Sequence, residues 1–312
     1  MKIYLAPLEG ITNNIFRANQ LKHFGGINKY YTPFITPTEN GNLGTKVIRD
    51  ILPENNKGQN LVPQILTNSA EGFLKMCNVF SQYGYTEFNL NLGCPSGTVV
   101  SKGRGSGFLA YTDELDCFLE KIYSSDYNIS IKTRIGLKES EEFYKLLEIY
   151  NKYPISELII HPRTRIDMYK NTPNWEIFKY AVKNSKNKLC YNGDIFTLAD
   201  YNKFISTFPT FDTIMIGRGI IRNPALPLMI ENVGNININS LKEFYYDIYT
   251  EYEKILSGTV PLLHKMKELT IYLAEIFEDN AKITKKVKKA KNIKEFNSAV
   301  TELFNNYKLK MG

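Results

Sequence analysis

The sequence lacks the features that direct a chain into or across a membrane. Its 312 residues contain no apolar run that approaches the roughly 18–20 residues of a transmembrane helix. The segment Met1–Pro7 has neither the apolar stretch nor the small-residue cleavage site of a signal peptide. We therefore expect a cytoplasmic protein with no membrane partner.

Metal-binding and disulfide patterns are also missing. The four cysteines, Cys77, Cys94, Cys117 and Cys190, form no C-x-x-C pair, and only three histidines accompany them. Without local ligand spacing we expect no zinc or other metal site, and we expect no disulfide framework in a cytoplasmic chain of this size. Scattered cysteines usually serve as small buried hydrophobes, although Cys94 lies in a motif of its own.

A strong excess of one charge is absent as well. Lys and Arg number 39 and Asp and Glu 32, which gives a net charge of +7. This mild basic excess is compatible with a polyanionic partner but does not require one. With 43% hydrophobic residues the chain can bury a core, which excludes an intrinsically disordered protein. The length suits one large α/β domain, or a barrel with a modest appendage.

What the sequence does contain is a regular alternation of short apolar runs and amphipathic stretches. The apolar runs predict strands at Ile3–Leu8, Tyr30–Ile35, Leu61–Leu66, Glu87–Leu92, Ile129–Arg134, Glu157–His161, Lys188–Asn192 and Phe211–Ile216. The amphipathic stretches predict helices at Ala70–Tyr83, Asp113–Tyr123, Ser140–Tyr150, Trp175–Val182 and Leu198–Phe208. Such alternation indicates a parallel sheet buried on both faces, and eight units in about 220 residues favour a closed (β/α)8 TIM barrel over an open sheet. The second unit is uneven, because Thr36–Lys57 is rich in Asn, Gly and Pro and predicts a loop.

The alternation stops after Asn223-Pro224. The polar segment Asn232–Ser240 predicts a linker, and Leu241–Lys308 has helical periodicity that is interrupted at Gly258 and Pro261. We therefore expect a barrel domain over residues 1–232 and a small domain of three or four helices over residues 240–312.

The helical part holds a run of lysines with no acid between them. Its members are Lys282, Lys285, Lys286, Lys288, Lys289, Lys291 and Lys294. One interpretation is an ordinary solvated helix face, and the other is a surface that contacts nucleic-acid phosphates.

In a barrel of this kind, chemistry collects at the carboxyl ends of the strands. The predicted strands bring polar or reactive residues there, namely Glu9, Gln64, Asn91, Cys94, Lys132, Arg134, His161, Arg163, Asn192, Asp194 and Arg218. A barrel with a purely structural role has no need for so many polar groups at one end. We therefore expect a catalytic site.

Two glycine clusters end the last two predicted strands, Asn192-Gly193-Asp194 and Gly217-Arg218-Gly219. One such cluster alone indicates a tight turn, but two at adjacent strand ends favour a phosphate site. Lys132 and His161 are donors suited to an electron-rich ring whose reduced form is negatively charged. The alternatives for Lys132 are a solvent-facing lysine or a Schiff-base nucleophile.

Cys94 precedes a segment with three glycines in five residues, Gly103, Gly105 and Gly107. This composition predicts a mobile lid over a substrate. A thiol beneath a lid can act as an acid toward a bound substrate, although an isolated cysteine is more often inert core.

Taken together and in this order, these residues resemble the tRNA-dihydrouridine synthase family, flavin enzymes of the (β/α)8 type. The matching blocks are Ala6–Thr12 with Phe16-Arg17, Asn91–Pro95, Ile131–Gly136, His161–Thr164 with Tyr169, Asn174 and Trp175, Asn192–Ile195, and Met215–Gly219 with Asn223-Pro224. Two positions depart from the family pattern. Asn89 stands where an aspartate is common, and Gly97 where a lysine is common.

The resemblance implies FMN as cofactor and NADPH, or NADH, as reductant. The implied cofactor-binding residues are Pro7, Gln64, Lys132, His161, Asn192, Gly193, Asp194, Gly217 and Arg218. Reduced flavin would pass a hydride to C6 of a uracil while Cys94 protonates C5. Asn91 and Arg134 would hold the uracil, and Lys265 and Lys267 of the helical domain would contact tRNA. No stable protein partner is implied.

Two other functions remain open from the residues alone. The first is a flavin-dependent oxidoreductase that acts on a free pyrimidine or another small molecule, which the lysine-rich helical part disfavours. The second is a non-catalytic RNA-binding protein built on a retired barrel, which the presence of Cys94 and Lys132 disfavours.

Overall fold

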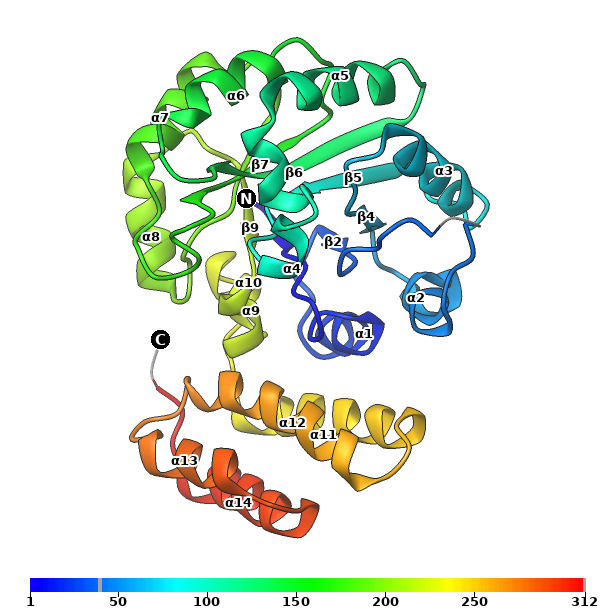
Figure 1. Cartoon of the computed structure of the whole chain (residues 1–312). Coiled ribbons are helices and arrows are strands. Elements are labelled where there is room, and N and C mark those ends of the chain that lie inside the picture. Colours follow the sequence, from blue (N-terminus) through cyan, green and yellow to red (C-terminus); the bar gives the residue numbers. More distant parts are fainter. Residues whose placement is uncertain (39–40, 311–312) are drawn as a thin grey trace.

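The computed structural model describes residues 1–38 and 41–310 and contains a parallel barrel followed by a layer of helices (Figure 1). The strands are β1 (Lys2–Leu5), β2 (Lys29–Tyr31), β3 (Leu61–Val62), β4 (Gln64–Ile65), β5 (Glu87–Leu92), β6 (Asn128–Gly136), β7 (Leu158–Thr164), β8 (Leu189–Tyr191) and β9 (Thr213–Ile216). Their order in the sheet is β3-β2-β1-β9-β8-β7-β6-β5-β4, and the paired strands are parallel.

The ring closes through a strand that proline divides in two. β3 pairs with β2 and β4 pairs with β5, while only Pro63 separates β3 from β4. Proline has no N–H to donate to a neighbouring strand, but the Pro63 carbonyl still accepts the N–H of Asn89 at 3.0 Å. The two halves therefore correspond to one predicted strand, and the prediction of a TIM barrel is confirmed.

Helices surround the barrel in the expected alternation. They are α1 (Asn14–His23), α2 (Thr45–Ile51), α3 (Ala70–Ser81), α4 (Gly97–Val100), α5 (Thr112–Tyr123), α6 (Glu142–Tyr150), α7 (Trp175–Asn184), α8 (Leu198–Thr207), α9 (Arg218–Arg222) and α10 (Leu226–Ile230), with short 3-10 turns at Pro53–Asn56 and Gly105–Ala110.

The prediction of a loop over Thr36–Lys57 is wrong in its second half, where α2 and a 3-10 turn form. The cause is a tertiary contact: the buried guanidinium of Arg17, on α1, donates to the Asp50 carbonyl at 2.8 Å and to Asn56 Oδ1 at 2.9 Å. These contacts hold the segment in place despite its loop-like composition. Residues 39–40 of the predicted loop lie outside the described residues.

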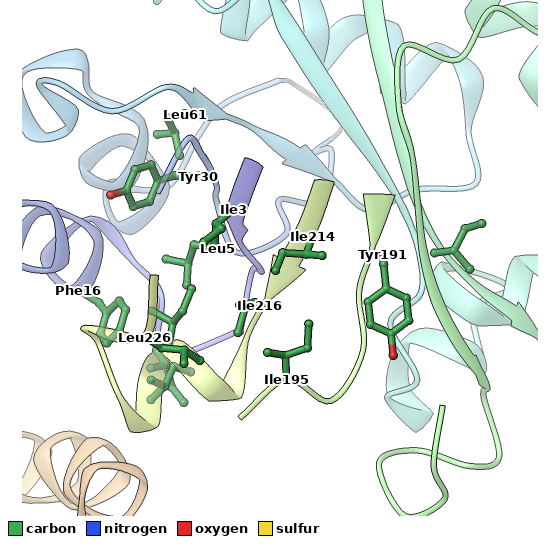
Figure 2. Packing of buried hydrophobic residues seen from close by; sticks show 14 of the residues in the cluster. Ile3, Leu5, Phe16, Tyr30, Leu61, Tyr191, Ile195, Ile214, Ile216 and Leu226 are labelled. Carbon is green, nitrogen blue, oxygen red and sulfur yellow. The ribbon is translucent and has the colours of Figure 1, made fainter. Parts of the chain in front are cut away.

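Alternating residues of the strands build two separate apolar clusters. The larger cluster fills the space between the strands and the surrounding helices, and Figure 2 shows part of it, with Ile3 and Leu5 of β1 near Ile214 and Ile216 of β9. The smaller cluster includes Tyr4 and Met215, the intervening residues on the same strands, and so faces the barrel axis. The barrel interior is thus packed with side chains.

The amino-terminal end of the barrel is closed by charged groups. The buried carboxylate of Glu157 accepts a hydrogen bond from the Tyr4 hydroxyl at 3.0 Å and lies 3.2 Å from the Lys188 ammonium and 3.6 Å from that of Lys29. A buried charge needs such partners. This arrangement leaves the opposite end of the barrel, where the strands terminate, for the functional site.

The C-terminal helical domain consists of α11 (Ile238–Ile255), α12 (Thr259–Ala274), α13 (Ala281–Lys289) and α14 (Ile293–Asn306). In Figure 1, α11 and α12 lie on the barrel side, and α13 and α14 lie farther from the barrel. The predicted break at Gly258 is confirmed, because this residue has a φ of +89°, which favours glycine, and immediately precedes α12.

The helical domain docks on α1 of the barrel. Phe16 and Phe244 meet edge to face with 5.7 Å between ring centroids, and the Tyr252 hydroxyl donates to Asn13 Oδ1 at 2.9 Å. Asp247 lies 2.7 Å from the ammonium of Lys22. In residues 1–38 and 41–310, no helix is both long and apolar enough to span a membrane.

Candidate active site

A pocket at the carboxyl ends of the strands, here called the barrel pocket, gathers most of the predicted cofactor residues. Those that line it are Pro7, Lys132, His161, Asn192, Gly193, Asp194, Gly217 and Arg218. They come from the ends of β1, β6, β7, β8 and β9. Residues about 210 positions apart in the sequence thus meet at one wall because parallel strands present their ends together.

The glycines of the barrel pocket permit close approaches of the backbone. A Cβ on Gly193 would lie 1.9 Å from the hydroxyl of Tyr191, and a Cβ on Gly219 would lie 2.1 Å from the Ile195 carbonyl oxygen. Gly219 belongs to the first turn of α9, where N–H groups have no partner within the helix. The wall can therefore present backbone donors to an anion such as a phosphate.

An arginine pair shares one carboxylate beside these donors. Asp194 Oδ1 accepts from Arg218 at 2.7 Å and from Arg163 at 3.0 Å. Arg163 is buried and was not among the predicted ligands. The sequence did place it at the end of the same strand as His161, and because it lies two residues after His161 on β7 it shares a face of the strand with it.

The histidine of the pocket is neutral and has a defined tautomer. Arg163 Nη1 lies 3.1 Å from His161 Nε2, and because a guanidinium can only donate, Nε2 accepts and Nδ1 bears the proton. Burial, followed by the nearby charges of Arg134 and Lys132, lowers the pKa of His161 well below its ordinary value. His161 thus offers one N–H donor without adding a charge.

Lys132 has a strongly shifted ionisation. Burial, and to a smaller extent the neighbouring Arg134, lowers the pKa of Lys132 from 10.5 to about 7. At neutral pH this amine is therefore close to half protonated, and a negative ligand would complete its protonation. Together with Arg163 and Arg218, it makes the pocket a place suited to an anionic cofactor.

Gln64 and Asn91 belong to a hydrogen-bonded chain of amides next to the pocket. Asn91 Nδ2 donates to Gln64 Oε1 at 2.7 Å, and Gln64 Nε2 donates to Asn89 Oδ1 at 2.8 Å. Asn89 Nδ2 then donates to the Ser130 hydroxyl at 3.0 Å. An aspartate at position 89 could not make this last donation, although the Ser130 hydroxyl could donate to it instead.

Asn91 also fixes the residue that we expect to be catalytic. Its Oδ1 accepts the N–H groups of Gly93 at 3.0 Å and of Cys94 at 2.9 Å. Cys94 itself is half-buried. Burial raises the pKa of its thiol, Glu9 adds to that effect, and Arg134 and Lys132 oppose it. The thiol therefore stays protonated at neutral pH and is suited to donate a proton.

The glycine-rich segment after Cys94 has regular structure. It folds into α4 and the 3-10 turn Gly105–Ala110, and the Ser106 hydroxyl donates to the Cys94 carbonyl at 2.8 Å. A Cβ on Gly105 would lie 2.8 Å from that carbonyl oxygen, and Gly105 has a φ of +57°. Gly105 therefore serves close packing around Cys94, and movement of the segment as a lid stays a prediction.

Arg134 holds two segments together. Its guanidinium is buried and donates to the carbonyls of Gly93 at 2.9 Å, Thr164 at 2.8 Å and Met168 at 2.9 Å. These contacts join the Cys94 strand to the loop after β7. Three N–H groups of Arg134 are engaged in these bonds, so the predicted contact with a uracil would have to use the others.

Tyr169, on the loop after β7, was missed as a pocket residue. Its ring centroid lies 4.7 Å from the guanidinium carbon of Arg218 and 5.4 Å from that of Arg134, and 6.1 Å from the ring centroid of His161. It thus bridges the predicted phosphate anchor and the predicted substrate residues. Its place in the block that resembles the family was the one available signal.

The two lysines predicted to contact tRNA lie outside the barrel pocket. Lys265 lies 5.1 Å from the ring centroid of Tyr252, and burial lowers its pKa. Lys267 donates to the carbonyls of Lys288, at 3.2 Å, and Ala290, at the end of α13. Lys265 thus faces a cavity between the two parts of the chain, whereas Lys267 caps a helix. Among the residues with described positions, no group of three His, Cys, Asp or Glu side chains could hold a metal ion.

Solved structures share the barrel fold. A variant of NCR from Zymomonas mobilis aligns with a TM-score of 0.53 and 13% identity, over 76% of this chain and 88% of its own. The old yellow enzyme from Trypanosoma cruzi aligns with a TM-score of 0.53 and 8% identity, over 76% of this chain and 89% of its own. Identities this low show a common fold and nothing beyond it.

Curated relatives match more of the sequence. The "Probable tRNA-dihydrouridine synthase" of Staphylococcus aureus (strain COL) is 29% identical over 262 residues, 80% of this chain and 78% of the relative. The "Probable tRNA-dihydrouridine synthase 2" of Bacillus subtilis (strain 168) is 28% identical over 258 residues, 80% of this chain and 78% of the relative. The family model described as "Dihydrouridine synthase (Dus)" matches residues 4–309. Because that model spans nearly the whole sequence, the chain belongs to the dihydrouridine synthase family.

Proposed function

We propose that this chain is an FMN-dependent tRNA-dihydrouridine synthase, which reduces the C5–C6 double bond of a uridine in tRNA with NADPH or NADH as reductant. The observation that carries the proposal is the juxtaposition of a protonated thiol, Cys94, with the cation-rich barrel pocket. Membership of the family supports it.

Different residues of the pocket suit the phosphate and the ring of FMN. The glycine wall at Gly193 and Gly217, with Arg218, would hold the phosphate. Asn192 and Asp194 border the same wall. The ring would lie against Pro7, Lys132 and His161, with Gln64 at its amide edge. The close packing of this wall around glycines, with cations beside it, is what a phosphate requires.

When bound, the flavin supplies the hydride that goes to C6 of the uracil, after a nicotinamide has reduced it. Cys94 donates the proton from Sγ to C5, so the two additions balance the loss of the double bond. The raised thiol pKa keeps that proton available, and the Arg134 and Lys132 charges stabilise the thiolate that remains. Asn91 positions Cys94 through its backbone.

The helical domain would bind the tRNA. The proposed bounds are residues 1–232 for the barrel domain and 240–312 for the helical domain, although its first helix, α11, begins two residues earlier, at Ile238. Residues 311–312 lie outside the described residues. The lysines of α13 are exposed, as a phosphate-contact surface requires. Lys265 remains a candidate contact, whereas a contact through Lys267 would require its ammonium to leave the end of α13. The uridine must leave its stacked position to reach Cys94.

The proposal is tested with purified protein loaded with flavin. We expect a yellow protein that, with NADPH and unmodified tRNA, adds two hydrogens to one uridine, detected by mass spectrometry of nuclease digests. A protein that never retains flavin, or that reduces a free pyrimidine but not tRNA, would contradict it. The second outcome would favour the small-molecule oxidoreductase. A measurement of tRNA binding against salt concentration also separates the two functions, because a small-molecule enzyme should bind tRNA weakly and without dependence on salt.

A further inference from the structure

A second cavity, of about 540 Å³, lies between the barrel and the helical domain, and we call it the interdomain cavity. Its barrel side includes Phe34, after β2, and Lys46 at the start of α2. Its helical side includes Leu256, which follows α11, and Pro261 and Lys265 of α12. Its walls therefore join segments more than 200 positions apart, and none of these residues takes part in the chemistry at Cys94.

Apolar side chains form part of the lining of the interdomain cavity, and two aromatic rings, those of Phe34 and Tyr252, belong to it. Phe34 is half-buried and lies in the run Pro33-Phe34-Ile35. Leu256 and Pro261 line the cavity as well. A flat ring can stack on an aromatic side chain in such a setting, and stacking on aromatics is the common way in which proteins hold unpaired bases.

The lining of the cavity carries charges of both signs. Lys46, Arg49, His264 and Lys265 line it together with Glu9, Asp50 and Glu268, and the ammonium of Lys265 lies 3.9 Å from Glu268. The ammonium of Lys46 pairs with Glu9 at 3.3 Å, and this pair is solvent-exposed, with 71% and 50% of the side chains accessible. An exposed pair of this kind holds with little free energy, so an incoming phosphate can replace the Glu9 carboxylate.

The interdomain cavity adjoins the catalytic site through one short segment. Pro7 lines the barrel pocket, and Glu9 and Gly10 line the interdomain cavity. Two residues of chain span at most about 7 Å. The Glu9 carboxylate also acts on both sites, because it raises the pKa of the Cys94 thiol and pairs with Lys46. Ligands of the two cavities can therefore be neighbouring units of one polymer.

We propose that the interdomain cavity binds the base of an unpaired nucleotide adjacent to the uridine that is reduced, with its phosphate at Lys46 and Lys265. This inference rests on the proposed function. It adds a readout of sequence context: the enzyme selects its uridine together with one neighbour, whose base stacks on Phe34. A nicotinamide dinucleotide is the less suitable occupant. It would deliver its hydride in the barrel pocket, and that step requires no residue of the helical domain.

The test is the pair of variants Phe34→Ala and Phe34→Tyr, each loaded with flavin. Removing a stacked base contact weakens binding by roughly 5- to 150-fold. We expect Phe34→Ala to lose tRNA affinity in that range and Phe34→Tyr to retain it, while NADPH reduces the flavin at the wild-type rate in both. Tyr144→Ala is the matched control, because this exposed tyrosine lies on α6, on the outside of the barrel.

A second arm uses tRNA that lacks one base, either 5′ or 3′ of the reduced uridine. One of these two RNAs should bind wild-type protein with the same reduced affinity that intact tRNA has for Phe34→Ala. On that RNA, the affinity of Phe34→Ala should be no lower than its affinity for intact tRNA. The inference would be overturned if the loss of affinity from Phe34→Ala added to the loss from the missing base on both RNAs. It would also be overturned if Phe34→Ala bound intact tRNA with wild-type affinity. An altered KM for NADPH with unchanged tRNA affinity would assign the cavity to the dinucleotide instead.

The variant Lys46→Glu, at another residue that lines the cavity, keeps the inference testable if Phe34→Ala fails to fold. Lys46→Glu changes a side chain that is 71% exposed, and we expect weaker tRNA binding with unchanged flavin content. Unchanged tRNA binding by Lys46→Glu would count against the cavity. If wild-type protein reduces no tRNA uridine at all, the proposed function fails; if it does so and both variants behave as wild type, only this inference fails.

Discussion

The side-chain oxygen of Asn91 accepts the backbone N–H of Cys94 at 2.9 Å, which ties the thiol-bearing residue to the end of β5. The same oxygen accepts the N–H of Gly93 at 3.0 Å. Asn91, the residue that we propose for holding the uracil, thus also positions the residue that we propose as the acid. Under that proposal, the position of the thiol and recognition of the uracil would be coupled through one amide.

We predict that Asn91→Ala slows uridine reduction without slowing flavin reduction. The change removes two accepted hydrogen bonds that orient Cys94, and a lost hydrogen bond of this kind is worth about 1–3 kcal/mol, or roughly 5- to 150-fold in rate. The measurement is a single-turnover reaction of reduced enzyme with tRNA. Asn91→Asp keeps an oxygen that can accept both N–H groups but loses the donation to Gln64, so its rate should lie between those of Asn91→Ala and wild type. Equal rates in all three proteins would contradict the coupling.

We predict that Cys94→Ala lowers the single-turnover rate of uridine reduction by about 10²- to 10⁴-fold, the usual contribution of a general acid. Flavin content and reduction by NADPH should not change. In wild type the rate should be flat through neutral pH and fall only in alkaline solution, because the acid form is lost when pH rises through the raised thiol pKa. A rate that rises with pH would instead assign Cys94 the role of a base.

We predict that FMN binding takes up protons at pH 8. In the cofactor-free protein Lys132 is mostly neutral at that pH because its pKa is about 7, and a phosphate-bearing ligand raises this pKa so that the amine gains a proton. Below pH 6 the uptake should vanish, since Lys132 is already charged. Isothermal titration in two buffers of different ionisation enthalpy measures it. Lys132→Met should abolish the uptake at pH 8; if it persists, another group is responsible.

We predict that Arg17→Met destabilises the fold by about 3–5 kcal/mol, because it leaves the Asp50 carboxylate, 3.3 Å from the guanidinium, without its buried partner. It also removes the contacts that hold α2. The measurement is urea unfolding followed by circular dichroism. Lys22→Ala breaks an exposed pair with Asp247 and should cost less than about 1 kcal/mol. Similar losses for both variants would refute the assigned role of Arg17.

We predict that neutralising Lys282, Lys285 and Lys289 on α13 reduces the salt dependence of tRNA binding. Each lost phosphate contact lowers the slope of log Kd against log salt concentration by about 0.7–0.9. Lys179, Lys183 and Lys186, on and just after α7, provide a control triple of the same charge. If both triples leave the slope unchanged, the α13 lysines form an ordinary solvated face.

The barrel could be predicted because strand formation here follows a local pattern. Runs such as Glu87–Leu92 and Phe211–Ile216 are apolar along their length, as strands buried on both faces must be, and they form β5 and β9. The third predicted strand, Leu61–Leu66, instead forms two short strands, because Pro63 cannot donate to a neighbour. Elements that depend on distant partners were not predictable: α2 needs Arg17, which lies in a different helix.

The site could be predicted in part for the same reason. Residues at strand ends, such as Lys132 and His161, converge in any parallel barrel, so identifying the strands also located them. The Asp194 bridge between Arg163 and Arg218 depends on rotamers that no spacing encodes. The interdomain cavity escaped altogether, because Phe34 and Pro261 belong to parts of the chain that only docking brings together.

Asp194 gives the protein a counter-ion of its own. Its single negative charge offsets one of the two positive charges of Arg163 and Arg218, so one positive charge remains beside the glycine wall. Under the proposed function, cofactor loading would be a partial exchange of anions, in which an external phosphate takes over Arg218 from an internal carboxylate. The affinity for the cofactor would then depend on the difference between these two interactions, and a stronger internal pair would make the protein release its cofactor more readily.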